Sequence, residues 1–180
     1  HLIDIKSGVM GAVPIVGSTI PIGVGTAWAH KLKKSRKIVV IFFGDGATEE
    51  GVFHESIDFA SLHNLPVLFV CENNNYSVYS SINKRQSKKR IITKISKASG
   101  INSFKYEGNK IEKVYNICKK LIHKIKNGNG PALIEFSTYR VLEHCGPNND
   151  NFLNYRSKKE VDEGINSCPI RNYKNKLLKD

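Results

Sequence analysis

The stretch from Ile38 to Tyr76 constrains the fold of this chain more than any other. It holds an apolar run, Ile38–Phe43, and a second apolar run that leads into the acid-and-amide sequence Glu72-Asn73-Asn74-Asn75-Tyr76. Short runs rich in Val, Ile and Phe, bounded by turn formers, are typical of strands covered on both faces. Residues 48–63 between them carry apolar and small side chains at helical spacing. The stretch therefore predicts a strand–helix–strand unit.

The two strands of such a unit are parallel, because their crossover is nearly always right-handed. Their carboxyl ends then share one edge of the sheet, which is where α/β proteins bind ligands. Asp45 follows the first strand within Gly44-Asp45-Gly46, and Asn74 follows the second. We therefore expect Asp45 and Asn74 to face one crevice.

The rest of the chain continues the alternation of helices and strands. The pattern predicts helices at 17–34, 91–99, 111–126 and 158–167, strands at 103–106 and 132–138, and loops at 1–16, 76–90 and 139–155. This order predicts an α/β fold with a doubly wound, mostly parallel sheet, in which residues 1–180 form one domain. Because the chain opens on His1 rather than Met, we expect it to be a fragment of a longer subunit.

Small residues recur within the predicted helix at 17–34, namely at Gly17, Gly23, Gly25, Ala27 and Ala29. Glycine lowers helix stability, so its repeated use has a packing or a functional reason. Close packing against another element and contact with a ligand both fit, and the two are compatible.

The formal net charge of +12 raises the question of a nucleic-acid or membrane partner. The basic residues are dispersed, and only the run Lys84–Arg90 approaches a patch, without a nucleic-acid-binding motif beside it. No apolar run is long enough to span a bilayer. We therefore expect no nucleic acid and no membrane, and an acidic protein partner instead. The four cysteines lack the spacing of a metal or disulfide framework, which favours a reducing, cytoplasmic location.

An acid between glycines at a strand end brings a carboxylate and main-chain amides to one point, which is what a metal-bound diphosphate requires. Gly44 and Gly46 permit close approach, Asp45 can hold Mg²⁺, and Asn74 can add a neutral oxygen ligand. The alternative is that Asp45 merely caps the next helix.

These motifs resemble the alpha subunit of the thiamine-diphosphate-dependent 2-oxoacid dehydrogenases, the first component of the pyruvate dehydrogenase complex and its relatives. The resemblance runs through most of the chain and implies the thiamine-diphosphate-binding fold. It is carried by His1-Leu2, Pro14-Ile15-Val16-Gly17, Phe43-Gly44-Asp45-Gly46-Ala47, Gly51, Phe53-His54-Glu55-Ser56, Leu65-Pro66-Val67, Glu72-Asn73-Asn74-Asn75-Tyr76, Thr138-Tyr139-Arg140, Glu143-His144 and Tyr155-Arg156.

The resemblance implies two cofactors, thiamine diphosphate and Mg²⁺. Asp45, the side-chain oxygen of Asn74 and the main-chain oxygen of Tyr76 would bind the metal, and Gly46 and Ala47 would contact the diphosphate.

Further roles follow from the same resemblance. Ile15 and Val16 would lie against the middle and the pyrimidine of the cofactor. His144 matches a catalytic histidine on a mobile loop that handles protons, and His1 matches a histidine at the substrate channel. Glu143 counts only as a neighbour of His144.

The implied activity is oxidative decarboxylation of a small 2-oxoacid, pyruvate first, with transfer of the acyl group to a lipoyl carrier. The implied partners are a beta subunit, in an assembly of two alpha and two beta subunits, and a lipoyl acyltransferase component. An acetoin or branched-chain 2-oxoacid dehydrogenase is the near alternative, because the motif indicates which cofactor is bound and does not indicate the substrate. A non-catalytic cofactor-binding or scaffold subunit is the alternative of a different class.

A departure from the family pattern affects a proposed cofactor contact. Pro14 stands where many relatives have Gly, which puts a main-chain contact from this position in doubt. We interpret His54, His63 and His123 as structural.

Overall fold

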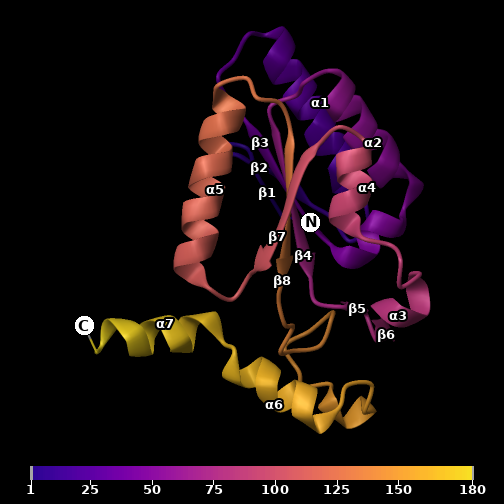
Figure 1. Cartoon of the computed structure of the whole chain (residues 1–180), viewed down its shortest axis with the longest axis vertical. Helices are drawn as coiled ribbons and strands as arrows, with labels where there is room; N and C mark the ends of the chain where they lie inside the picture. Colours follow the sequence, from indigo (N-terminus) through magenta and orange to yellow (C-terminus); the bar gives the residue numbers. More distant parts are fainter. Residues whose placement is uncertain (1, 180) are drawn as a thin grey trace.

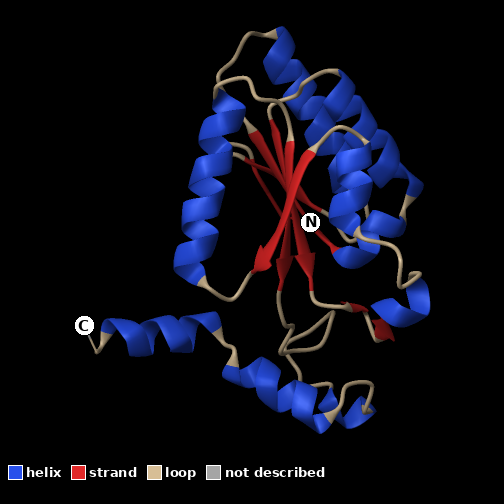
Figure 2. Ribbon diagram, viewed as in Figure 1, coloured by secondary structure: helices blue, strands red, loops and turns tan. Residues whose placement is uncertain are grey.

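A parallel four-stranded sheet forms the centre of the computed structural model, which describes residues 2–179 (Figures 1 and 2). The prediction for His1 lies outside the described residues. Across the sheet the strands are β3 (Val39–Gly44), β4 (Val67–Asn73), β8 (Ala132–Ser137) and β7 (Asn102–Glu107). All three neighbouring pairs are parallel, so every strand ends at the same edge.

Helices cover both faces of this sheet. α1 (Thr19–Leu32), α2 (Gly51–Leu62) and α4 (Ile92–Ala98) lie on one face, and α5 (Ile111–Lys126) lies on the other (Figure 1). The connections from β3 to β4 and from β4 to β7 cross the sheet in one direction, whereas the connection from β7 to β8 runs back. With right-handed crossovers, that reversal places α5 opposite α2 and α4. The predicted doubly wound α/β architecture is confirmed.

The two faces of β4 divide the core into two apolar clusters. Phe69 packs with Phe53 and Ile20 in the cluster beneath α1, α2 and α4. Leu68 and Val70, which alternate with Phe69 along the strand, pack beneath α5. Adjacent strand residues point to opposite faces, so a central strand covered on both sides is apolar throughout.

The amino-terminal stretch differs from its prediction as a loop. It contains an antiparallel hairpin of β1 (Leu2–Asp4) and β2 (Val9–Ala12), all of whose residues are exposed. The Asp4 carboxylate accepts from the Ser7 hydroxyl and the Ser7 amide, at 2.5 and 3.3 Å, and Gly8 takes a positive φ of 85°. These side-chain contacts close the turn of the hairpin.

Short elements also replace parts of the other predicted loops. After β4 the chain forms β5 (Tyr76–Ser77), β6 (Ser80–Ser81) and α3 (Ile82–Arg85), which Ser81 caps. A 3₁₀ turn, η1 (Asp45–Glu49), precedes α2, so the regular helix starts later than predicted, and η2 (Asn151–Leu153) interrupts the loop after β8.

Two helices follow that loop and lie beyond the carboxyl edge of the sheet (Figure 1). α6 (Lys158–Asn166) was predicted, and α7 (Pro169–Leu177) was not. Pro169 begins α7, because proline fits the first helical turn, where its missing amide is not needed. Within residues 2–179, no helix has the length and apolar character that crossing a membrane requires.

Candidate cofactor and metal site

Asp45 lies at the carboxyl end of β3, where the strand gives way to η1. It follows Gly44, which pairs in register with Glu72 of β4, and it is only 1% exposed. Its side chain caps neither η1, whose N-cap is Gly44, nor α2, whose N-cap is Glu50. The alternative interpretation of Asp45 as a helix cap is therefore wrong, and its carboxylate has a partner other than a helix terminus.

The charge of Asp45 is stabilised by few groups. Burial raises the pKa of the Asp45 carboxyl, and the opposing effects of the Arg85 guanidinium and of the main-chain amides of Asp45 and Asn74 leave it above its usual value. Arg85 donates to Asp45 Oδ2 through Nη2 at 2.6 Å. Gly44 pairs with Glu72 in the parallel register, so the ends of β3 and β4 lie side by side, as the parallel topology predicts.

Two successive asparagine turns shape the end of β4. Asn73 Oδ1 accepts from the main-chain amide of Asn75, and Asn74 Oδ1 accepts from that of Tyr76, both at 2.9 Å. Asn75 adopts a positive φ of 67°, which asparagine tolerates better than most residues. A carbonyl oxygen has two lone pairs, so Asn74 Oδ1 retains one for another partner.

Gly46 lets the start of η1 lie close to β5. A Cβ atom at this position would lie 2.9 Å from Ser77 Oγ and 3.2 Å from Ser77 Cβ. A side chain at this position would displace Ser77, so glycine favours the close passage of the chain after Asp45 beside β5. Ala47, the next predicted contact residue, is 5% exposed.

The grouping of Asp45, Asn74 and Tyr76 at one edge fits a hard divalent cation. A carboxylate, an amide oxygen and a main-chain oxygen are ligands that Mg²⁺ accepts beside water and phosphate. Among residues 2–179, no group of three or more His, Cys, Asp or Glu side chains is placed to hold a metal. A site with one carboxylate and neutral oxygens does not need such a group.

Ile15 and Val16 lie on the turn between β2 and α1 and are 70% and 57% exposed. The turn is closed by Ser18, which donates to the Ile15 carbonyl through its amide and its hydroxyl. A Cβ at the neighbouring Gly17 would lie 3.2 Å from Glu50 Cγ. The turn thus packs beside the junction of η1 and α2, on the Asp45 side of the edge.

His144 lies on the irregular loop between β8 and α6, and its side chain is exposed. This loop packs on the hairpin that follows Asn74: Arg140 donates to the Val78 carbonyl at 2.9 Å, and the Tyr155 ring contacts the Tyr76 ring at 5.3 Å. The structure therefore places the loop of His144 at the predicted edge, while the proton-handling role of His144 stays a prediction.

The basic run Lys84–Arg90 does not behave as the uniformly solvated stretch that its composition suggests. Arg85 contacts the carboxylates of Asp45 and Glu49, and Arg90 donates to the hydroxyl and carbonyl oxygens of Thr48. Sequence reasoning missed both arginines, because the two segments that meet are about forty residues apart. The only available signal was the position of the run directly after the asparagine-rich strand end.

Glu135 is a second residue that the sequence interpretation missed. It is an acid within the otherwise apolar run of β8 and is 2% exposed. Its carboxylate accepts from the Asn73 side-chain amide at 2.8 Å. A lone acid in a buried strand is the signal that could have identified it, because such a charge needs a partner.

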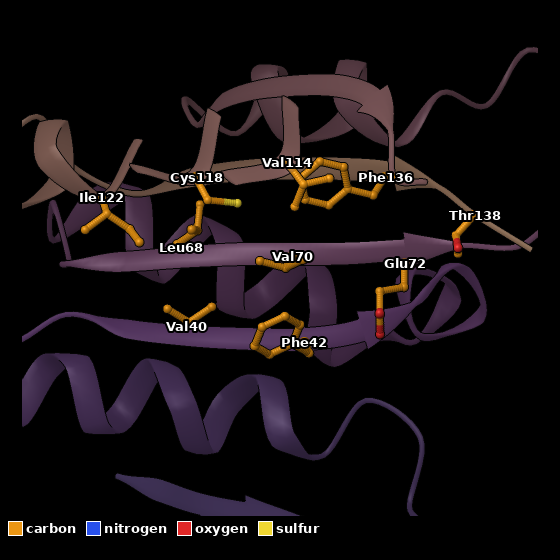
Figure 3. Close-up of a pocket in the computed structure, with 11 residues that line it drawn as sticks. Val40, Phe42, Leu68, Val70, Glu72, Val114, Cys118, Ile122, Phe136 and Thr138 are labelled. Atoms are coloured by element: carbon orange, nitrogen blue, oxygen red, sulfur yellow. The ribbon is translucent and has the colours of Figure 1, made fainter. Parts of the chain in front are cut away.

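A cavity of about 400 Å³ opens between α5 and the sheet and does not coincide with this edge (Figure 3). Its lining is almost wholly apolar and includes no predicted site residue. It is formed by Val40, Phe42, Leu68, Val70, Glu72, Gly108, Val114, Cys118, Ile122, Phe136 and Thr138. The cavity exists because α5 leaves part of β3 uncovered, where Val40 and Phe42 are 38% and 62% exposed.

The fold defines a doubly wound α/β protein, with the candidate site residues Asp45 and Asn74 at the carboxyl edge of its sheet. A sequence model of the family described as "Dehydrogenase E1 component" matches residues 1–180. The chain belongs to this family.

The names of similar proteins agree with the family and differ in the compound that they specify. The chain is 34% identical, over its whole length, to the alpha subunit of acetoin:2,6-dichlorophenolindophenol oxidoreductase of Bacillus subtilis, of which it covers 53%. It is 36% identical over 89% of its length to the pyruvate dehydrogenase E1 component subunit alpha of Rickettsia typhi, covering 48%. It is 33% identical over 92% of its length to the 2-oxoisovalerate dehydrogenase subunit alpha of Bacillus subtilis, covering 49%. The chain thus spans about half the length of these relatives.

A solved structure supports the fold. It comes from Mycobacterium smegmatis, its description is that of a thiamin diphosphate-dependent enzyme, and it superposes with a TM-score of 0.54 at 21% identity. The match covers 69% of this chain and 22% of that one.

Proposed function

We propose that this chain belongs to the alpha subunit of a thiamine-diphosphate-dependent 2-oxoacid dehydrogenase that decarboxylates pyruvate and passes the acyl group to a lipoyl carrier. The observation that carries the proposal is the buried Asp45 carboxylate at the end of β3, which ends beside β4 and its Asn74 turn at the carboxyl edge of the sheet. A buried acid beside neutral oxygen donors suits a magnesium-bound diphosphate. Membership of the Dehydrogenase E1 component family supports the same assignment.

Each residue at the edge has a role in this proposal. Asp45, Asn74 through its side chain and Tyr76 through its main-chain oxygen hold Mg²⁺. The backbone at Gly46 and Ala47, at the start of η1, donates to the diphosphate. The bound cofactor supplies the nucleophilic carbon and the electron sink, while the protein positions it and excludes water.

The apolar turn and the exposed loop complete the proposed site. Ile15 and Val16 flank the organic part of the cofactor from the turn before α1. His144, on the loop that packs against Tyr76 and Val78, transfers protons during acyl transfer. The exposure of Ile15, Val16 and His144 is consistent with a site whose other half comes from a beta subunit.

The proposed assembly contains two alpha and two beta subunits, works with a lipoyl acyltransferase and is cytoplasmic. Its test uses the full-length subunit co-expressed with a beta subunit. We expect pyruvate-dependent reduction of an artificial electron acceptor that requires both thiamine diphosphate and Mg²⁺. Asp45→Asn should abolish this activity, whereas Asp58→Asn, at an exposed position of α2, should leave it unchanged. A lack of activity with every 2-oxoacid tested and with acetoin would refute the proposal.

The choice of substrate needs its own comparison, because the three relatives act on different compounds by name. Steady-state rates with pyruvate, acetoin and 2-oxoisovalerate in the same preparation would rank them. A clear preference for acetoin would favour the alternative that the relative matched over the whole chain suggests.

The alternative of a different class, a non-catalytic cofactor-binding or scaffold subunit, predicts a different result. Calorimetric titration of the same preparation with thiamine diphosphate and Mg²⁺ separates binding from turnover. Binding without turnover would favour that alternative, and binding unaffected by Asp45→Ala would remove the proposed metal ligand.

A further inference from the structure

We propose that the Arg85 guanidinium pairs with the Asp45 carboxylate before the divalent metal ion binds, and that it competes with the metal ion for this carboxylate. This inference rests on the proposed function in one respect, the assignment of Asp45 as a metal ligand. It adds a residue to the site that neither the sequence motif nor the resemblance identifies.

The contact between Arg85 and Asp45 is short and screened from water. Arg85 Nη2 lies 2.6 Å from Asp45 Oδ2, and the two side chains are 13% and 2% exposed. Exposed ion pairs contribute little, because water and salt weaken them. A charge-assisted hydrogen bond at this distance and burial is much stronger. A metal ion that binds the Asp45 carboxylate must therefore displace the Arg85 guanidinium from it.

The guanidinium has other partners when it leaves. Arg85 Nη1 contacts the Glu49 carboxylate, and Nε donates to the Ser80 carbonyl at 3.0 Å. Glu49 is more exposed than Asp45, and Gln86 donates to it at 2.6 Å, which holds it beside Arg85. Arg85 can thus release Asp45 and remain paired with Glu49.

Simultaneous occupation of Asp45 by both cations is unfavourable. Two positive groups a few ångströms apart repel each other strongly where water is scarce. Mg²⁺ also requires near-octahedral geometry at short distances, which leaves little room for a guanidinium on the same carboxylate. The carboxylate therefore exchanges partners. Before the exchange, Arg85 neutralises a buried acid that would otherwise be costly to leave unpaired.

The test measures metal binding without the cofactor, so that it does not depend on activity. The full-length subunit, purified with its beta subunit and stripped of metal, is titrated with Mn²⁺, and free Mn²⁺ is measured by electron paramagnetic resonance. We expect Arg85→Ala to lower the dissociation constant about tenfold, because a charge-assisted hydrogen bond no longer opposes the metal. Arg85→Gln, which keeps much of the side chain without its charge, should act in the same direction.

Lys84→Ala is the matched control. Lys84 is the exposed neighbour of Arg85 and carries the same charge. Its removal therefore measures how much the loss of one nearby positive charge, without the contact to Asp45, changes Mn²⁺ binding. We expect its dissociation constant to stay within about twofold of the wild type, since exposed charges interact weakly.

The outcomes separate this inference from the proposed function. The proposed competition is overturned if both Arg85 variants bind Mn²⁺ no more tightly than the wild type. It is also overturned if Lys84→Ala lowers the Mn²⁺ dissociation constant as much as the Arg85 variants do. Mn²⁺ binding that survives Asp45→Ala unchanged overturns the proposed metal role of Asp45 instead.

Discussion

Glu135 on β8 accepts a hydrogen bond from the side-chain amide of Asn73, which lies 2.8 Å away at the end of β4. Asn73 in turn accepts from the Asn75 amide, and Lys105 of β7 contacts the same Glu135 oxygen at 2.7 Å. These contacts join three neighbouring strands to the turn that carries Asn74. The orientation of a proposed metal ligand therefore depends on a buried acid two strands from Asp45.

Glu135→Ala should destabilise the protein, because it leaves the Asn73 amide without its buried partner. We expect the free energy of unfolding to fall by about 2–3 kcal/mol, with most of the loss at Asn73, since Lys105 is half exposed. Urea unfolding measures the change. Glu135→Gln, which keeps an acceptor oxygen, should lose less, and Glu55→Ala, on the exposed side of α2, should change little. Equal losses for Glu135→Ala and Glu55→Ala would contradict this account.

Two glycines of α1 separate the packing explanation of the small residues from the ligand explanation. A Cβ at Gly23 would lie 2.5 Å from Cγ1 and Cδ1 of the buried Ile41, whereas a Cβ at Gly25 would meet nothing within 4 Å. Gly23→Ala should therefore cost about 1–3 kcal/mol through overpacking. Gly25→Ala should stabilise by about 0.5–1 kcal/mol, because alanine is the better helix former. Thermal unfolding of both variants tests this, and a shift of the same sign in both would refute it.

The buried part of the fold could be predicted from the sequence, because an element with a buried face carries apolar side chains at regular intervals along the chain. The predicted bounds of α5, Ile111–Lys126, equal the observed ones, since its apolar stripe faces the sheet and buries Leu121 and Ile125 in the core. The meeting of Asp45 and Asn74 could also be predicted, because parallel strands linked by one crossover must end at one edge.

Elements without a buried face could not be predicted in this way. All residues of β1 and β2 are exposed, and α7 has no buried residue, so neither leaves a pattern of apolar side chains. The contact of Arg85 with Asp45 depends on how the segment after β4 folds back. Residue spacing along the chain does not encode that path.

Gly46→Ala tests how closely β5 must approach the start of η1. The added Cβ would lie 2.9 Å from Ser77 Oγ, so Ser77 has to shift by a few tenths of an ångström. We expect a loss of about 1 kcal/mol in the free energy of unfolding and weaker binding of thiamine diphosphate with Mg²⁺, measured by urea unfolding and calorimetry. Gly51→Ala is the control, because a Cβ there meets nothing within 4 Å.

A second-site change identifies the clash as the cause. Ser77→Gly removes the two side-chain atoms that the new Cβ would approach within 3.2 Å and leaves Arg85 Nη1 at an ordinary contact distance of 3.6 Å, so it should recover most of the stability lost in Gly46→Ala. Failure of the double variant to recover stability, with Ser77→Gly alone close to the wild type, would show that Gly46 is needed for another reason.

Asp150 stabilises the loop of His144 through a buried ion pair. Arg156 donates to Asp150 Oδ1 at 2.5 Å and Tyr155 donates to Oδ2 at 2.7 Å, and the Asp150 and Arg156 side chains are 1% and 3% exposed. Burial raises the pKa of the Asp150 carboxyl, but Tyr155 and the charges of Arg156 and Arg140 outweigh it and hold the pKa below its usual value. A carboxyl with a lowered pKa stabilises the fold while it is ionised.

The stability that Asp150 contributes should therefore be present above the pKa of the unfolded chain, about 3.9, and disappear as the pH falls through the lower pKa of the folded state. At pH 7, Asp150→Asn should lower the free energy of unfolding by about 2–4 kcal/mol, because it leaves Arg156 buried without its charge partner. Urea unfolding at pH 7, 5, 4 and 3 measures the difference from the wild type, which should shrink only in the most acid samples. Asp58→Asn, an exposed control, should show little difference at any pH. A difference between Asp150→Asn and the wild type that stays constant from pH 7 to pH 3 would contradict the role of the ionised carboxylate.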